Sequence, residues 1–210
     1  AAAHRGDFAE AGLHHDHALQ LSRAAYDLPG TARTLDRLGT LARHEGNLAA
    51  AEAAYAESLA LFRELGDLVN ASIVLSNLGE VLHRHGESAR AAEHFEEALR
   101  LERKLDLPDG VAFDLMNLAR VRLDLGEPDH AATLIGQGVR LFRDMGNQLG
   151  LANALAVQAI ICRAVGKTHR ARSLLSESLG ILAQLNEQAA MPEHLEQMSA
   201  VLAERDQVDL

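Results

Sequence analysis

The sequence contains no tryptophan and few other aromatic residues, although nearly half of it is apolar. Phe, Trp and Tyr make up 3% of the 210 residues, whereas the apolar fraction is 48%. Alanine and leucine therefore supply most of the apolar volume, which suits close helix–helix contacts better than a β-sandwich or an enzyme core with aromatic walls. No apolar run reaches the ~18 residues of a membrane span, so we expect a soluble protein without membrane association.

The sequence also contains one cysteine and two lysines, and its net charge is negative. The one cysteine, Cys162, excludes an internal disulfide and fits a reducing compartment, so we expect a cytoplasmic location. The net charge of −10 argues against direct nucleic-acid binding, which needs a basic footprint. Only two of the 20 basic residues are lysine, a composition that favours a bacterial source with a GC-rich genome.

A repeat of 40 residues runs through the whole sequence. At that shift, glycines align at Gly6, Gly46, Gly86, Gly126 and Gly166. The aligned leucines upstream are Leu35, Leu75, Leu115 and Leu155. The aligned alanines downstream are Ala11, Ala51, Ala91, Ala131 and Ala171, and a bulky column four residues later holds His15, Tyr55, Phe95, Ile135 and Leu175. Such self-similarity indicates stacked supersecondary units.

Each repeat predicts two amphipathic helices and no strand. The leucines before Gly86 are spaced as one stripe of a first helix, and a second apolar stripe follows that glycine. The glycine column is expected to close each first helix in a left-handed turn. Small residues such as Gly39 and Ala51 should face each other and bring the paired helices close, while Tyr55 fills the gap to the next helix.

The pattern Leu-x-x-Leu-Gly-x-x-Leu, followed by glycine, alanine, an aromatic residue and a small residue, resembles the tetratricopeptide repeat (TPR), whose commonest period is about 34 residues. The longer period implies longer helix pairs. The sequence is similar to the long-period repeats of kinesin light chains and of the polarity adaptors that bind GoLoco peptides. It is also similar to the C-terminal arms of large bacterial LuxR-like and antibiotic-regulatory transcription activators, of which YAESLALFRELGD is typical.

This resemblance covers essentially the whole chain and implies an all-α, right-handed superhelical solenoid of helix hairpins. We expect one domain, residues 1–210, with a partial repeat at 1–30, four repeats at 31–70, 71–110, 111–150 and 151–190, and a capping helix at 191–210. The opening AAAHRGDF is expected to be the tail of a first helix that ends at Gly6.

The resemblance implies a non-catalytic module without a cofactor that binds a protein or peptide in the groove lined by its first helices. We expect the regulatory or sensor arm of a larger bacterial transcriptional or signalling regulator. The alternative is a structural scaffold that self-associates through an open N-terminal end, where His15 and Leu19 lack an upstream neighbour.

In TPR proteins the ligand contacts come from first-helix positions outside the packing stripe. Asn77 and Asn117 are expected to hold a peptide backbone, since a carboxamide offers a donor and an acceptor; the alternative is that each bonds only a neighbouring helix or water. Charged candidates, which suit a carboxylate ligand or are simply solvated, are Arg43, Glu80, Arg84, Arg120 and Arg163. Ile73, Phe113 and Met116 would form an apolar floor, or else belong to the packing stripe, and Asn153 completes the candidates.

The cluster His14, His15, Asp16 and His17 is the one candidate metal site and the basis of a less favoured alternative, a metal-dependent enzyme. Zinc needs three or four converging ligands, and nothing near this cluster completes the set. We therefore predict no metal and no catalytic residues.

Overall fold

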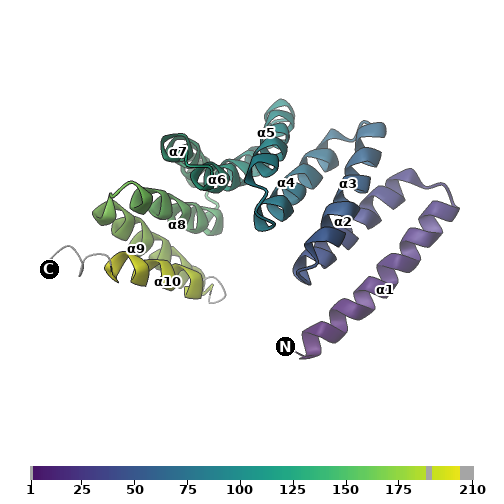
Figure 1. Ribbon diagram of the computed structural model, residues 1–210, viewed down its shortest axis with the longest axis horizontal. Helices are drawn as coiled ribbons and strands as arrows, with labels where there is room; N and C mark the ends of the chain where they lie inside the picture. The colour runs from purple at the N-terminus through teal and green to yellow at the C-terminus, as the bar shows by residue number, and fades with distance from the viewer. Residues whose placement is uncertain (1, 188–190, 204–210) are drawn as a thin grey trace. The chain divides into compact units, whose positions relative to one another are not determined.

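The computed structural model describes residues 2–187 and 191–203, and these residues form ten helices and no strand. The chain divides into two compact units, residues 1–106 and 107–210. None of the described helices is long and apolar enough to cross a membrane. The prediction of an all-α chain of helix hairpins is confirmed (Figure 1).

Consecutive helices pack against each other within each unit. The first unit contains α1 (Ala2–Ala24), α2 (Leu28–His44), α3 (Leu48–Glu64), α4 (Leu68–Arg84) and α5 (Ser88–Lys104). The second contains α6 (Pro108–Asp124), α7 (Pro128–Asp144), α8 (Gln148–Ala164), α9 (Thr168–Leu185) and α10 (Met191–Ala203). The closest pairs are α2–α3, α4–α5, α6–α7 and α8–α9, so each predicted repeat contributes one hairpin with a first and a second helix.

The glycine column forms the turn inside each hairpin, as expected. Gly46, Gly86, Gly126 and Gly166 have φ angles of 78°, 84°, 78° and 76°, in the left-handed region that glycine adopts without steric cost. After Gly46, the N–H of Asn47 donates to the carbonyl of Ala42 at 2.8 Å, which satisfies a helix-end carbonyl. The Asn47 side chain then accepts from the N–H of Ala50 and begins α3.

The expected turn at Gly6 is wrong, because α1 is continuous from Ala2 to Ala24. A glycine inside a helix costs only about 1 kcal/mol relative to alanine, so alignment with the turn glycines does not by itself impose a turn.

The turns between hairpins also share one conformation, although their sequences differ. Gly66 and Gly146 have positive φ, and so do Tyr26, Asp106 and Asn186 at the matching positions. Asparagine and aspartate tolerate this region, whereas tyrosine does so at a cost. The position in the repeat therefore sets the turn even where glycine is replaced.

Each small residue of the first helix faces a bulky residue of its own second helix. A Cβ added to Gly39 would lie 2.7 Å from the Tyr55 ring, and one added to Gly79 would lie 2.9 Å from the Phe95 ring. This contact corrects the expectation that Gly39 faces Ala51 and that Tyr55 fills the gap to the next helix. The later repeats place alanine at the first position and an aliphatic residue at the second, so the summed volume stays similar.

A second recurring contact joins the second helix to the backbone of the first. The Ser58 hydroxyl donates to the carbonyl of Ala32 at 2.8 Å, and the Ser178 hydroxyl donates to the carbonyl of Ala152 at 2.7 Å. Both serines are fully buried. Because both bonds span 26 residues, they mark the face of a second helix that packs on its own first helix.

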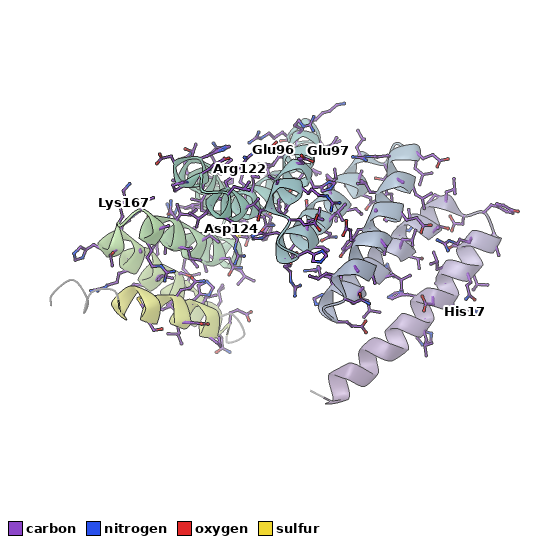
Figure 2. The ribbon with its side chains drawn as sticks, viewed as in Figure 1. His17, Glu96, Glu97, Arg122, Asp124 and Lys167 are labelled. Carbon is purple, nitrogen blue, oxygen red and sulfur yellow. The ribbon has the colours of Figure 1, made fainter. Side chains whose placement is uncertain are left out.

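Ion pairs join successive second helices on the opposite side of the hairpins. Arg63 contacts Glu97 at 2.5 Å, and Arg143 contacts Glu177 at 3.1 Å; Glu97 is labelled in Figure 2. The side chains are 32–56% exposed, and exposed pairs contribute about 0–1 kcal/mol. They add little to stability but show that the repeat register extends to the surface.

Glu102 is a buried carboxyl at a position that other second helices fill with Phe62, Phe142 or Leu182. It is 3% exposed, and burial raises the pKa of this carboxyl to about 7 from an ordinary value of 4.5. Its Oε2 atom has no hydrogen-bond partner among the described residues. Ionisation of Glu102 is therefore unfavourable in the folded state.

Replacing Gly79 by alanine should destabilise the protein, because the new Cβ would press on the Phe95 ring at 2.9 Å. Overpacking costs about 1–3 kcal/mol, more than the ~1 kcal/mol that alanine gains over glycine in a helix. We expect a net loss of about 1 kcal/mol in the free energy of unfolding, measured by urea denaturation. The same change should cost less in a Phe95→Ile background, which recreates the Ala119–Ile135 combination. An equal cost in both backgrounds would contradict direct packing of the two positions.

Glu102→Gln should flatten the dependence of stability on pH. The folded state holds the proton more tightly than the unfolded state, so the contribution of Glu102 to stability is full below about pH 4.5 and falls until about pH 7. The variant should gain about 1–3 kcal/mol over the parent between about pH 5 and pH 8, measured by urea denaturation at both values. Glu96→Gln on the same helix controls for the loss of one negative charge. Parallel pH curves for parent and Glu102→Gln would refute the raised pKa.

Candidate functional site

In the first unit, the predicted groove residues on α2 and α4 are joined by hydrogen bonds. The Asn77 amide of α4 donates to the Asp36 carboxylate of α2 over 3.3 Å. Burial raises the pKa of Asp36, and this bond from Asn77 partly offsets that shift. Asn77 therefore bonds a neighbouring helix, which is the second of the two roles considered for it. One amide hydrogen and the carbonyl oxygen of the carboxamide make no hydrogen bond to the described residues.

Arg43 and Glu80 form the second link between α2 and α4. Their side chains lie 2.7 Å apart, and Arg43 is the more buried partner. The Tyr55 hydroxyl lies 3.0 Å from the hydroxyl of Thr40 and also bonds Arg43. Burial raises the pKa of Tyr55, so the phenol stays neutral. The positive charge of Arg43 is therefore compensated by the carboxylate of Glu80. This face of the first unit is polar and already paired.

In the second unit, residues of α6, α8 and α10 enclose a cavity of about 170 Å³. Three of the predicted site residues line it: Met116, Arg120 and Asn153. The remaining lining residues, which the sequence did not indicate, are Ala156, Val157, His194 and Gln197. The cavity has apolar walls at Met116 and Val157 and polar groups around them. The structure thus brings one part of the predicted groove together as a concave site.

The apolar candidates separate into exposed and buried positions. Ile73 is 47% and Phe113 is 41% exposed, whereas Met116 is 7% exposed. The Phe113 ring meets the buried Phe142 ring edge-on, with centroids 4.9 Å apart. Ile73 and Phe113 therefore keep surface for a partner, while Met116 serves packing and reaches the surface only through the cavity.

The remaining candidates lie on first helices outside the cavity. Asn117 is half-buried on α6 and makes no side-chain hydrogen bond to the described residues. Arg84 is exposed on α4 and donates to the carbonyl of Arg43 at 3.5 Å. Arg163 is half-buried on α8.

The histidine cluster of α1 does not converge on a shared point. His14, Asp16 and His17 are exposed and His15 is half-buried; His17 is labelled in Figure 2. Among the described residues, the group with metal-ligand spacing is instead Glu52, His85 and Glu87. Its two carboxylates already accept from the guanidinium of Arg90, at 2.9 and 2.5 Å. We assign no metal to either cluster.

Sequence reasoning missed the contribution of α10 to the cavity. His194 is buried and Gln197 is half-buried, although the helix at 191–210 was expected only to cap the array. The sequence did contain a signal for this contribution of α10. Its residues match the positions of the first helices, and first helices turn one face toward the groove. Val157 lies at the repeat position of Asn77 and Asn117 and was not a candidate, yet its apolar side chain supplies part of the cavity wall.

A family model described as tetratricopeptide repeat matches residues 1–64, 31–104 and 71–144. No curated protein matches the sequence.

Solved structures are similar in fold. BtubC (BKLC) from P. vanneervenii is 21% identical, with a TM-score of 0.77 over 92% of this chain and 82% of that chain. A putative kinesin light chain with nearly identical TPR-like repeats from Podosopora anserina is 16% identical, with a TM-score of 0.69 over 88% and 92%. MamA is 17% identical, with a TM-score of 0.63 over 87% and 93%. These identities support a shared fold alone.

Removing the Asn77 side chain should raise the pKa of Asp36 further, because the amide bond that favours the carboxylate is lost. Asn77→Ala should also lower the free energy of unfolding by about 1 kcal/mol at neutral pH. NMR titration of the Asp36 carboxyl carbon measures the first effect, and urea denaturation measures the second. Asn117→Ala, at the matching position of the next repeat, is the control. An unchanged Asp36 titration in Asn77→Ala would mean that the bond is absent in solution.

Proposed function

Because the chain belongs to the tetratricopeptide repeat family, we propose that it is a non-catalytic module that binds a protein or peptide on the exposed faces of its first helices. The single observation that carries this proposal is the cavity between α6, α8 and α10, which three independently predicted site residues line. Partner recognition there would use a preformed surface, so little conformational entropy would be lost in ordering the receptor.

The size of the cavity favours one anchoring side chain over a small-molecule ligand. Small-molecule sites usually occupy about 300–1,000 Å³, and this cavity measures about 170 Å³. Met116 and Val157 provide apolar walls. An aliphatic or aromatic side chain of a partner would be desolvated there, in the manner of a binding hot spot.

Polar groups around the cavity suit the backbone and charge of an extended segment. Asn153 can donate to and accept from a peptide group, and Asn117 directly follows the cavity residue Met116 on α6. Gln197 offers a buried Oε1 that has no hydrogen-bond partner among the described residues. Arg120 brings a positive charge to the cavity lining, and charges on two partners are usually complementary, so we propose that an acidic group accompanies the apolar anchor.

The first unit offers a second, weaker surface around Ile73 and Arg84. The neighbouring Arg43–Glu80 and Asn77–Asp36 pairs are formed without a ligand, and a partner would have to compete with them. We therefore assign the main anchoring role to the second unit and a supporting role to the first.

Catalysis is disfavoured by what the described side chains can do. Burial raises the pKa of the Cys162 thiol, which opposes formation of the nucleophilic thiolate.

We further propose that this module is the regulatory or sensor arm of a larger bacterial transcriptional or signalling regulator in the cytoplasm. The resemblance of YAESLALFRELGD to the arms of such regulators supports this role, as do the arginine-rich composition and the one cysteine. Binding of the partner would shift the larger protein from one conformational state towards another.

Ala156→Met should weaken peptide binding by about tenfold or more, equivalent to ~1.4 kcal/mol, because the larger side chain would fill the cavity. Methionine occupies the matching position 116, so the helix can carry it. The probe is a peptide with an apolar anchor and an acidic residue, selected from a random displayed library on the parent chain. Its affinity is measured by isothermal titration calorimetry.

Ala132→Met, at an exposed position of α7, is the matched control and should bind like the parent. Thermal unfolding of both variants verifies that the fold is retained. Failure to select any peptide, or equal affinity for Ala156→Met and the parent, would refute the cavity as the binding site.

A further inference from the structure

In the first unit, residues of α1, α2 and α3 line a cavity of about 430 Å³ that the proposed peptide site does not use. Small-molecule sites usually occupy about 300–1,000 Å³, so this cavity is large enough for a small molecule. Its apolar walls include Leu38, Leu41, Ala42 and Ala54.

The cavity lies between packed helices. A Cβ added to Gly12 of α1 would lie 3.4 Å from the Cδ2 atom of Leu41 on α2, so these two helices are in contact at the cavity wall. Ala50 and Ala54 line it from α3. The walls are therefore the faces that the three helices turn toward one another.

The next repeat fills the matching space with its own side chains. Arg90 of α5 stands at the repeat position of Ala50, and Glu52 of α3 stands at that of Gly12. The guanidinium of Arg90 contacts the carboxylates of Glu52 at 2.9 Å and Glu87 at 2.5 Å. The matching helices α3, α4 and α5 thus hold an arginine between two carboxylates, where the first repeat has a cavity.

The apolar residues at the base of this space show the same difference. Val81 and Leu82 of α4 are 0% exposed. The matching residues of α2, Leu41 and Ala42, are only half-buried, and both line the cavity. A ligand in the cavity would therefore remove apolar surface from water, which favours binding.

The charge of the lining is negative. Asp16 of α1 and Glu45 at the end of α2 contribute carboxylates, and none of the described residues that line the cavity is basic. The first repeat thus keeps acidic groups beside the apolar walls but has alanine where the next repeat supplies the positive charge.

We propose that this cavity binds a small organic cation, an alkylguanidinium, in the place that the Arg90 side chain takes in the next repeat. Its charged group would pair with the carboxylates of Asp16 and Glu45, because the planar guanidinium fork matches carboxylate geometry. Its alkyl chain would lie along Leu41 and Ala42, as the stem of an arginine lies along apolar surface.

Isothermal titration calorimetry of the 210-residue chain with hexylguanidinium tests the proposal. Hexylurea is the control ligand, because it has nearly the same shape and no charge. The parent should bind the guanidinium about tenfold or more tightly than the urea, since charge-assisted hydrogen bonds are the stronger ones.

Ala50→Arg should abolish binding, because it recreates the position of Arg90 and places a guanidinium of the chain itself in the cavity. Ala49→Arg is the matched control, since Ala49 is the exposed preceding residue and does not line the cavity. Thermal unfolding of both variants verifies that the fold is retained.

Glu45→Gln is a second variant that keeps the size of the side chain. It should weaken binding of hexylguanidinium by about tenfold, because a hydrogen bond to a charged group is lost. Glu64→Gln, at an exposed position of α3 outside the cavity, should bind like the parent.

Absence of hexylguanidinium binding to the parent, or equal affinity for hexylurea, would overturn the proposal. An unchanged affinity in Ala50→Arg would do so as well. A chain that binds an arginine-containing peptide but not hexylguanidinium would overturn the assignment to a small molecule.

Discussion

The contact of a glycine or alanine on each first helix with a bulky residue on its second helix is the constraint on which the rest of the structure depends. At Gly79 the Phe95 ring occupies the space that a Cβ would need, and at Gly39 the Tyr55 ring does the same. This contact sets the approach of the two helices, and the turn glycines set the point at which the chain reverses. The same contact recurs at 40-residue intervals, and it determines which positions of each helix face the partner helix.

The repeat positions whose side chains do not pack within a hairpin carry different residues in the two units. In the first unit these positions carry Asp36 and Asn77, which hydrogen-bond to each other. The polar side chains of this surface therefore also contribute to the stability of the fold. In the second unit the corresponding columns carry Met116 and Val157, and their apolar side chains border a cavity. One repeat frame thus presents a paired polar face and an apolar site with polar groups around it. Recognition by such a surface depends on a few anchors rather than on the whole contact area.

Periodicity was sufficient to predict the hairpins, because side-chain volume and turn conformation repeat with the sequence. It failed at Gly6, where one alignment column could not distinguish a turn from a helix interior. It also did not show that Tyr26 and Asp106 adopt the positive φ of the matching glycines, because their residue types do not favour that conformation. The candidate site residues lie on first helices, but their contacts depend on neighbours in another repeat. The bond between Asn77 and Asp36 spans 41 residues, and His194 enters the cavity from α10; neither follows from the columns of a single repeat.

The central claim is that packing commits the second helices to structure and leaves the first-helix faces for a partner. Hydrogen-exchange mass spectrometry of the chain with and without a selected peptide tests it most directly. We expect the peptide to slow amide exchange in α6 and α8, the first helices that line the cavity, and to leave α7 and α9 unchanged. Slower exchange confined to α7 and α9 would contradict the claim.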